Sequence, residues 1–330
     1  MPLKNANLNI AVIGPLATSD YVGGYSAPDA KGISILDGLK KRAGSSVSIA
    51  YSKGYDPKPD SSQLLNEAIK TVLASDVAVV VLGEEPDEVG EGRDRTDLDL
   101  SDKALNMIKA IKATGKPVVV VLFNGRPLSI NWIADSIAAI VETWFAGEQG
   151  GLAIADALPG NINPSGKLPI TFPRSVGQLP FYYDHKPTSN HRYVDEKNTP
   201  LFAFGHGLSY TTFAYSDLTI TPQNISTTGN ADVSFTIKNT GEVAGSEVAQ
   251  LYVRDVVSSV TTPEIALKGF VRAELQPGES KTIHCIITPE QLSLRNREMK
   301  QVVEPGKFII MVGSASDDIK LNGILNVSGK

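Results

Sequence analysis

The sequence predicts an α/β sandwich, in which a mainly parallel sheet lies between helices, followed by an all-β sandwich. In the first half of the chain, continuous apolar runs such as residues 77–82 alternate with segments of helical periodicity. Such runs are typical of parallel strands that are covered on both faces. In the second half the hydrophobic period changes to two, as in residues 233–237, which predicts antiparallel strands. The length of 330 residues also fits two domains of about 150 residues each.

The first half of the chain alternates between strand and helix patterns. Each predicted strand is a short apolar run that ends in a turn, and each predicted helix has apolar residues three or four positions apart. Ser101 is a predicted N-cap and Gly44 a predicted C-cap. The predicted strands are residues 8–14, 47–51, 77–82, 118–123 and 138–144, and the predicted helices are residues 29–43, 61–73, the segment after Ser101, 128–134 and 147–158.

The rest of the chain begins with a segment of weak periodicity. Residues 161–200 are rich in Pro, Asn, Gly and Tyr, and their aromatic side chains need a surface on which to pack. We therefore predict an α/β domain over residues 1–160, an irregular connection packed on the domains over residues 161–212, and a β-sandwich of about seven strands over residues 213–330. Strands predicted in the last region include residues 233–237, 248–254, 266–275, 280–287 and 308–312.

Composition and charge argue against two classes of partner. The net charge of -5, without a basic cluster beyond residues 40–42, argues against nucleic acid. No stretch approaches the roughly 18 apolar residues that span a bilayer. Residues 1–7 lack the apolar region of an export signal. We therefore expect a soluble chain without a membrane partner, whose native compartment the sequence leaves unknown.

The sequence predicts neither a metal site nor a cofactor. The single cysteine, Cys285, lies in the apolar run 282–287, which favours a buried and inert thiol. The four histidines have no metal-ligand spacing, and the glycines form neither GxGxxG nor a P-loop. Packing is favoured over sugar or metal binding for the aromatic residues of the connection and a nearby histidine, which are Tyr182, Tyr183, Tyr193, Phe202 and His206.

The segment 79–100 is the strongest candidate for a functional site. It begins in the strand predicted at residues 77–82 and continues as an acidic loop that contains glycines. In an open α/β sheet, ligands bind outside the carboxyl ends of the strands, where this loop is expected to lie. The residues alone fit equally well a loop whose acids are only solvated. The carboxylates of the loop include Glu84, Glu85, Asp87, Glu88, Glu91, Asp94 and Asp97.

Several long motifs resemble, in the same order, those of the C-terminal half of the glycoside hydrolase family 3 β-glucosidases and β-xylosidases. The likeness covers nearly the whole chain. It implies an α/β sandwich followed by a fibronectin type III-like domain, in agreement with the periodicity. The motifs are NIAVIGPLA at residues 9–17, GEGRDRTDLDL at 90–100, VETWFAGEQGGLAIADALPG at 141–160, PLFAFGHGLSYTTF at 200–213 and LKGFVRAELQPGES at 267–280.

The resemblance also implies a role for Glu91. In the family, a loop of the sandwich supplies a glutamate that acts as general acid and then as base, and Glu91 matches it because it directly precedes GRDRTDL at residues 92–98. A retaining glycosidase needs two carboxyl groups ~5 to 5.5 Å apart. The acid needs a raised pKa, which requires burial or a neighbouring negative charge. The second carboxyl group, an aspartate nucleophile, belongs to a (β/α)8 barrel that this sequence does not contain.

The sequence therefore predicts the C-terminal portion of a retaining β-glycosidase of β-glucosidase type, incomplete and inactive by itself. Its expected partners are a β-linked glucoside or xyloside, between which the sequence does not choose, and a (β/α)8 barrel domain or subunit. Two alternatives remain open. One is a non-catalytic module that binds carbohydrate or a protein, and the other is an enzyme of unrelated chemistry whose acidic loop holds a divalent cation.

Overall fold

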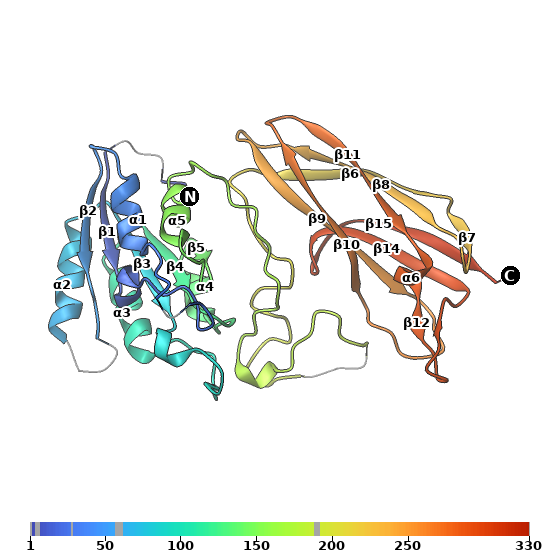
Figure 1. Ribbon diagram of the computed structural model, residues 1–330, viewed down its shortest axis with the longest axis horizontal. Helices are drawn as coiled ribbons and strands as arrows, with labels where there is room; N and C mark the ends of the chain where they lie inside the picture. Colours follow the sequence, from blue (N-terminus) through green and yellow to red (C-terminus); the bar gives the residue numbers. More distant parts are fainter. Residues whose placement is uncertain (1, 4–6, 28, 57–61, 188–191, 330) are drawn as a thin grey trace. The chain divides into compact units, whose positions relative to one another are not determined.

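The computed structural model describes residues 2–3, 7–27, 29–56, 62–187 and 192–329 (Figure 1). The chain forms two compact units. Unit 1 comprises Met1–Ile162 and Pro173–Leu179, and unit 2 comprises Asn163–Phe172 and Pro180–Lys330. The segment predicted as an irregular connection is therefore divided between the two units.

Unit 1 is built on a five-stranded sheet. Its strands are β1 Asn9–Ile13, β2 Ser48–Ser52, β3 Val77–Gly83, β4 Val118–Phe123 and β5 Ala139–Glu142. Each strand is parallel to its neighbours, in the order β2-β1-β3-β4-β5. The central strands β3 and β4 are buried along almost their whole length, as their uninterrupted apolar sequences predict.

Helices cover both faces of this sheet. They are α1 Ile35–Arg42, α2 Ser62–Leu73, α3 Asp102–Ala113, α4 Asn131–Ser136 and α5 Gly150–Ala157, with 3-10 turns η1 Pro15–Thr18, η2 Pro86–Glu88 and η3 Val176–Gln178. α1 and α5 pack together and bury their apolar side chains on one face, against Val12, Val79 and Val121. α2 and α3 contact each other on the other side of the sheet (Figure 1). The predicted α/β sandwich is confirmed.

The helix predicted at residues 29–43 is wrong at both ends. It begins only after Ser34, whose hydroxyl accepts a hydrogen bond from the Asp37 N–H (3.1 Å) and so caps the first turn. It ends before Ala43, which takes an extended conformation, so Gly44 is not the C-cap. The hydroxyl cap therefore decides where α1 begins, although the apolar spacing predicts a start several residues earlier.

Two other helices begin later than predicted. The helices predicted at 128–134 and 147–158 start after Ile130 and Gln149, because these two residues have non-helical backbone angles. The prediction for α3 is confirmed, since the Ser101 hydroxyl accepts a hydrogen bond from the N–H three residues later (3.3 Å). The strands predicted around these helices are confirmed within a few residues.

The packing of α1 on α5 depends on two glycines. A Cβ on Gly38 would lie 2.1 Å from the carbonyl oxygen of Gly151, and a Cβ on Gly151 would lie 2.2 Å from that of Ser34. Neither distance leaves room for a side chain, so the two helix backbones are in direct contact. This contact explains the small-residue composition of the helix predicted at 147–158.

Unit 2 is a β-sandwich of two sheets, as predicted. One sheet has the order β10-β9-β14-β15-β7 and the other the order β11-β8-β6. A small hairpin, β12 Leu294–Arg295 with β13 Gln301–Val302, and the helical turn α6 Pro289–Leu292 complete the unit. The main strands are β6 Phe213–Thr221, β7 Asn224–Ser226, β8 Ala231–Asn239, β9 Gly245–Asp255, β10 Ala266–Leu275, β11 Ser280–Ile287, β14 Gly306–Ala315 and β15 Asp318–Ser328.

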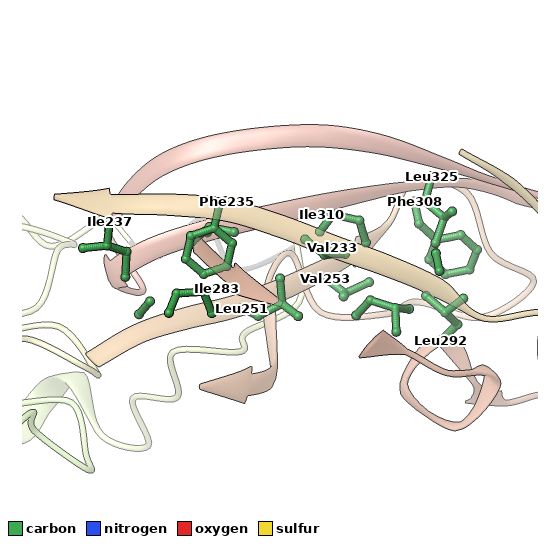
Figure 2. Close-up of a cluster of buried hydrophobic side chains, with 14 of the residues drawn as sticks. Val233, Phe235, Ile237, Leu251, Val253, Ile283, Leu292, Phe308, Ile310 and Leu325 are labelled. Carbon is green, nitrogen blue, oxygen red and sulfur yellow. The ribbon is translucent and has the colours of Figure 1, made fainter. Parts of the chain in front are cut away.

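The two sheets of unit 2 enclose one apolar core (Figure 2). Alternate residues of β8, including Val233, Phe235 and Ile237, have at most 1% of their surface exposed. Leu251 of β9 and Ile310 of β14 are buried to the same extent. The period of two seen in the sequence is therefore the alternation between this core and the solvent.

The sequence missed several strands of this sandwich. β6 and β15 are the longest of them, and both carry polar or glycine residues that interrupt the apolar alternation. β7 pairs parallel to β15, so the sandwich is not wholly antiparallel. Pairing with a neighbouring strand stabilises these segments, although their own sequences give a weak signal.

Aromatic side chains of the connection pack within unit 2, as favoured by the sequence. Tyr183 stacks on Phe204 with ring centroids 4.1 Å apart, and its hydroxyl accepts a hydrogen bond from the Leu267 N–H (3.2 Å). The His206 ring stacks on Phe202 at 5.2 Å. Of the other two, Tyr193 is half-buried and Tyr182 has 66% of its surface exposed.

The Cys285 thiol is half-buried on β11. Burial raises its pKa, and the Asp232 carboxylate adds to this effect. A raised pKa lowers the fraction of reactive thiolate, in agreement with the inert thiol that the sequence favours.

In the described part of the chain, the helices are too short or too polar to span a bilayer.

Candidate active site

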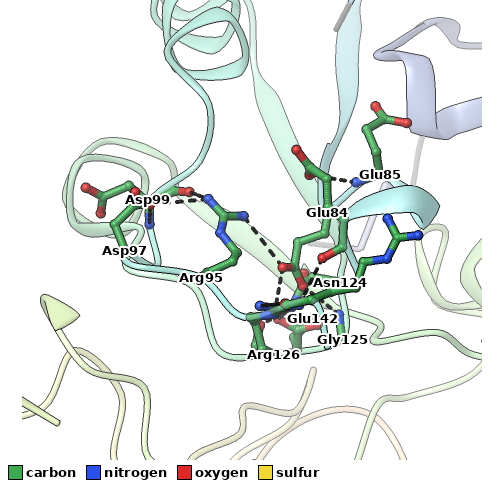
Figure 3. Close-up of polar contacts among 11 residues, drawn as sticks. Glu84, Glu85, Arg95, Asp97, Asp99, Asn124, Gly125, Arg126 and Glu142 are labelled. Carbon is green, nitrogen blue, oxygen red and sulfur yellow. Dashed lines mark hydrogen bonds and ion pairs between the residues drawn. The ribbon is translucent and has the colours of Figure 1, made fainter. Parts of the chain in front are cut away.

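Three segments of unit 1 meet at one edge of its sheet. Because β3, β4 and β5 are parallel neighbours, the segments that follow them start at the same edge. Glu84 follows β3, residues 124–126 follow β4, and Glu142 ends β5. Figure 3 shows the side chains of these segments close together. The acidic loop therefore starts at the carboxyl edge of the sheet, as its sequence predicts.

Glu84 is a buried carboxylate. Its side chain has no exposed surface, and its Oε1 lies 2.8 Å from Nε of Arg126 and 3.6 Å from Nη1 of Arg95. Its Oε2 accepts a hydrogen bond from the Gly125 N–H (3.0 Å). A charge is stable away from water only when it is paired and hydrogen-bonded. The two guanidinium groups therefore account for the burial of Glu84.

The Arg126 guanidinium also holds the backbone of the acidic loop. Its Nη2 donates a hydrogen bond to the Glu88 carbonyl (3.1 Å), and its Nη1 donates one to the Arg93 carbonyl (3.2 Å). These two carbonyls lie on either side of Glu91 in the sequence. One side chain, fixed by Glu84, thus contacts the loop both before and after the predicted acid/base residue.

Glu91 itself is exposed, between two glycines with positive φ. Gly90 has φ +145° and Gly92 has φ +69°, conformations that few other residues adopt. The Oε2 of Glu91 accepts a hydrogen bond from the Tyr25 hydroxyl (3.3 Å). The structure does not bring Glu91 into the buried cluster around Glu84. A general acid at this position would need a further group to bury it, because burial raises the pKa of a carboxyl group.

Within the segment 79–100, the pKa values of Glu85 and Asp99 are raised, in both cases mainly by burial. For the Glu85 carboxyl group, the charges of Glu88 and Asp87 add to this effect. Glu85 and Glu88 also form a capping box at η2, in which the Glu85 N–H donates to the Glu88 side chain (3.1 Å). Glu85 therefore has a structural role at the start of the loop, which makes it a useful control for Glu91.

Glu142 is a second carboxyl group at this edge, and its residue is half-buried. Burial raises its pKa to about 7, and the nearby charge of Glu84 contributes to the increase. The Trp144 N–H and the Asn124 side chain donate hydrogen bonds to its two oxygens, at 2.9 and 3.3 Å, and partly oppose the shift. A carboxyl group with this pKa exchanges its proton near neutral pH.

The sequence analysis missed the roles of Glu84, Glu142 and Arg126. A signal was available, since a carboxylate directly after a buried apolar strand is typical of an edge site. Their pairing could not be predicted, because it joins segments about 40 and 60 residues apart whose side-chain directions depend on the fold. No group of three or more His, Cys, Asp or Glu side chains that could hold a metal ion occurs in the described residues. The guanidinium groups of Arg95 and Arg126 lie beside the buried Glu84 carboxylate of this loop.

Comparisons with known proteins identify the two parts of the chain. The model of the glycosyl hydrolase family 3 C-terminal domain matches residues 1–210, and the model of the fibronectin type III-like domain matches residues 247–316. The resemblance inferred from the sequence motifs is confirmed.

Curated relatives and solved structures agree with this assignment. The chain is 45% identical to a β-xylosidase of Formosa agariphila, over 97% of the chain and 46% of that protein. It is 40% identical to the periplasmic β-glucosidase of Salmonella typhimurium, over 97% of the chain and 46% of that protein. The crystal structure of a Listeria innocua β-glucosidase with glucose matches with a TM-score of 0.92 at 34% identity, over 100% of the chain and 47% of that structure.

The chain spans about half the length of the curated relatives it matches. The family match itself covers well over half of the chain. The chain therefore belongs to glycosyl hydrolase family 3, and it contains the family's C-terminal domain followed by a fibronectin type III-like domain.

Proposed function

We propose that this chain is the C-terminal portion of a retaining β-glycosidase, a β-glucosidase, and that Glu91 is its general acid and base. The observation that carries the proposal is the family match over residues 1–210, combined with relatives of twice the length that are named as β-glucosidases and β-xylosidases. A (β/α)8 barrel, as a further domain or a separate subunit, would supply the aspartate nucleophile and most contacts to the sugar.

The position of Glu91 supports this role. A general acid must reach the glycosidic oxygen of a substrate, and Glu91 is exposed on a loop at the carboxyl edge of the sheet, where ligands bind. In the first step the protonated Glu91 carboxyl would protonate the leaving oxygen while the aspartate attacks the anomeric carbon. In the second step the Glu91 carboxylate would remove a proton from water, which then displaces the aspartate. Contact with the barrel would exclude water and raise the pKa of Glu91.

The names of the relatives are consistent with two classes of substrate, β-glucosides and β-xylosides. Both β-glucosidases and β-xylosidases match at similar coverage. We propose a β-glucoside as the substrate, because most of the matched relatives and structures are named as β-glucosidases. An aryl β-xyloside assayed beside an aryl β-glucoside decides between them.

A complementation experiment tests the proposal. The chain is joined to, or mixed with, the barrel portion of the Salmonella β-glucosidase, and hydrolysis of 4-nitrophenyl β-glucoside is measured. We expect activity with the wild type, a loss of about 10² to 10⁴-fold with Glu91→Gln, and near wild-type activity with Glu85→Gln. Azide should restore turnover of 2,4-dinitrophenyl β-glucoside by Glu91→Gln, because this anion needs no general base. If Glu91→Gln complements as well as the wild type, the assignment is wrong.

Binding measurements address the non-catalytic alternative. Calorimetry of the chain alone with gluco-, cello- and xylo-oligosaccharides should show no tight binding, since the barrel is proposed to hold most of the sugar. Tight binding by the isolated chain, without activity after complementation, would instead support a carbohydrate-binding module.

A further inference from the structure

We infer that Arg126 is a positioning residue for the acid/base loop, and that the buried Glu84 carboxylate fixes Arg126 in place. This inference rests on the proposed role of Glu91 and adds the device that holds it. Arg126 does not contact Glu91 in the structure. It contacts the backbone on both sides of Glu91 and thereby limits where the carboxyl group can lie.

The three nitrogens of the Arg126 guanidinium are all engaged. Nε pairs with Glu84 at 2.8 Å (Figure 3). Nη2 donates to the Glu88 carbonyl at 3.1 Å, and Nη1 donates to the Arg93 carbonyl at 3.2 Å. A planar guanidinium presents its donors in fixed directions, whereas an ammonium group is a single charge on a flexible stem. Arg126 can therefore hold Glu84 and two carbonyls at once, which lysine cannot.

The loop needs such a restraint. Gly90 and Gly92, which flank Glu91, both have positive φ and leave this stretch of backbone with great freedom. Between η2 and α3 no helix or strand is present in the structure. The ends of the flexible stretch are held by Arg126, so that Glu91 moves only within a short span.

Glu84 anchors a second arginine that holds the rest of the loop. Nη1 of Arg95 lies 3.6 Å from Glu84, while its Nη2 donates to the Asp99 carbonyl (2.9 Å) and to the Asp97 carboxylate (3.2 Å). The loop is thus tied to one buried carboxylate before and after Glu91. This arrangement gives the burial of Glu84 a function, since a buried ion pair alone contributes little net stability.

Positioning of this kind affects proton transfer more than binding. A general acid works only within hydrogen-bond distance of the leaving oxygen, and a displacement of about 1 Å can lower the rate about 10²-fold. A substrate whose leaving group departs without protonation does not need this precision. Substitution of Arg126 should therefore lower kcat/KM more strongly for substrates whose leaving groups have a higher pKa.

Hydrogen exchange tests the restraint without any assay of activity. In this chain without the barrel portion, Arg126→Lys and Arg126→Gln should raise the exchange rates of amides in residues 86–96 by about 10-fold or more. Arg42→Gln is the matched control, because Arg42 also pairs with a carboxylate of unit 1, Asp156 at 2.9 Å, but on α1. This control should leave residues 86–96 unchanged. Equal exchange of residues 86–96 in all four proteins would overturn the inference.

Kinetics of the complemented enzyme test the consequence for catalysis. With Arg126→Lys, kcat/KM should fall by about 10²-fold for a poor leaving group such as 4-methylphenyl β-glucoside. The loss should be less than about threefold for 2,4-dinitrophenyl β-glucoside, for which protonation matters little. Equal losses for both substrates would show a merely structural role and would refute the inference. If Glu91→Gln itself shows no dependence on the leaving group, the proposed function fails, whatever the exchange experiment shows.

Discussion

The Nε of Arg126 lies 2.8 Å from Oε1 of Glu84, a carboxylate whose side chain has no exposed surface. This ion pair joins the end of β3 to the segment after β4, and it is the fixed point to which the acidic loop is attached. The loop can therefore be both exposed at Glu91 and rigid at its base. Removal of one partner would leave a charge without its counter-charge, and it would also release the loop that carries Glu91.

Glu84→Gln should lower the free energy of unfolding of unit 1 by on the order of 3 kcal/mol, because it leaves two arginines without their buried counter-charge. Urea denaturation followed by tryptophan fluorescence measures this, since the two tryptophans, Trp132 and Trp144, both lie in unit 1. Asp97→Asn removes the exposed partner of Arg95 and should cost less than about 1 kcal/mol. Similar losses in the two variants would contradict the anchoring role of Glu84.

The sequence predicted this region unevenly. The carboxyl-edge position of the acidic loop followed from the apolar run that precedes it, because strand direction and burial are encoded locally. The identity of Glu91 as acid and base came from a motif and remains a prediction. The pairing of Glu84 with Arg126 was missed, because it depends on the register between β3 and β4, which no local pattern encodes.

The distinction between local patterns and contacts between distant segments also explains which strands and helices were predicted correctly. β4 was predicted at its observed bounds because six consecutive apolar residues are unambiguous. β15 was missed because Gly323 stands at an apolar position of its alternation and Ile324 at a polar one. The neighbouring strands β14 and β7 supply the pairing that makes it a strand. The start of α1 was wrong because the hydrogen bond that the Ser34 hydroxyl accepts from the Asp37 N–H outweighs the apolar spacing before it.

Gly38→Ala should destabilise unit 1 by about 1 to 3 kcal/mol, because the added methyl group cannot fit against the backbone of α5. Gly44→Ala is the control: nothing lies within 4 Å of the added Cβ. It should be neutral or slightly stabilising. Urea denaturation followed by tryptophan fluorescence compares the two variants. The proposed contact between the helix backbones is wrong if Gly38→Ala unfolds at the same urea concentration as Gly44→Ala.

Phe235→Ala should destabilise unit 2 by about 3 to 5 kcal/mol, since Phe235 is 1% exposed at the centre of the sandwich core (Figure 2). The measurement is hydrogen exchange of β8 and β11, whose amides should lose protection. Phe270→Ala changes a side chain that is 67% exposed on β10 and should leave this protection nearly unchanged. An equal effect of both substitutions would mean that Phe235 does not occupy the core.

Glu142 should make the stability of unit 1 depend on pH. Burial, with a contribution from Glu84, raises its pKa from 4.5 to about 7 in the folded chain. The folded state therefore binds more protons than the unfolded state in this range, and the free energy of unfolding falls as the pH rises from 4.5 to 7. One pKa unit corresponds to about 1.4 kcal/mol, so the loss is up to about 3 kcal/mol.

Glu142→Gln tests this dependence, because the amide keeps the shape of the side chain and does not ionise. At pH 8 the variant should be more stable than the wild type, by up to about 3 kcal/mol, since it avoids a buried charge. At pH 4.5 the difference should shrink, because the Glu142 carboxyl group is protonated in the folded state. Urea denaturation at both pH values, followed by tryptophan fluorescence, measures it. Glu148→Gln, at an exposed position of unit 1, should show no such change. A wild type whose stability relative to Glu142→Gln stays constant between the two pH values would mean that the pKa of Glu142 is the same in the folded and unfolded states. The hydrogen bonds from Trp144 and Asn124 would then offset the effect of its burial.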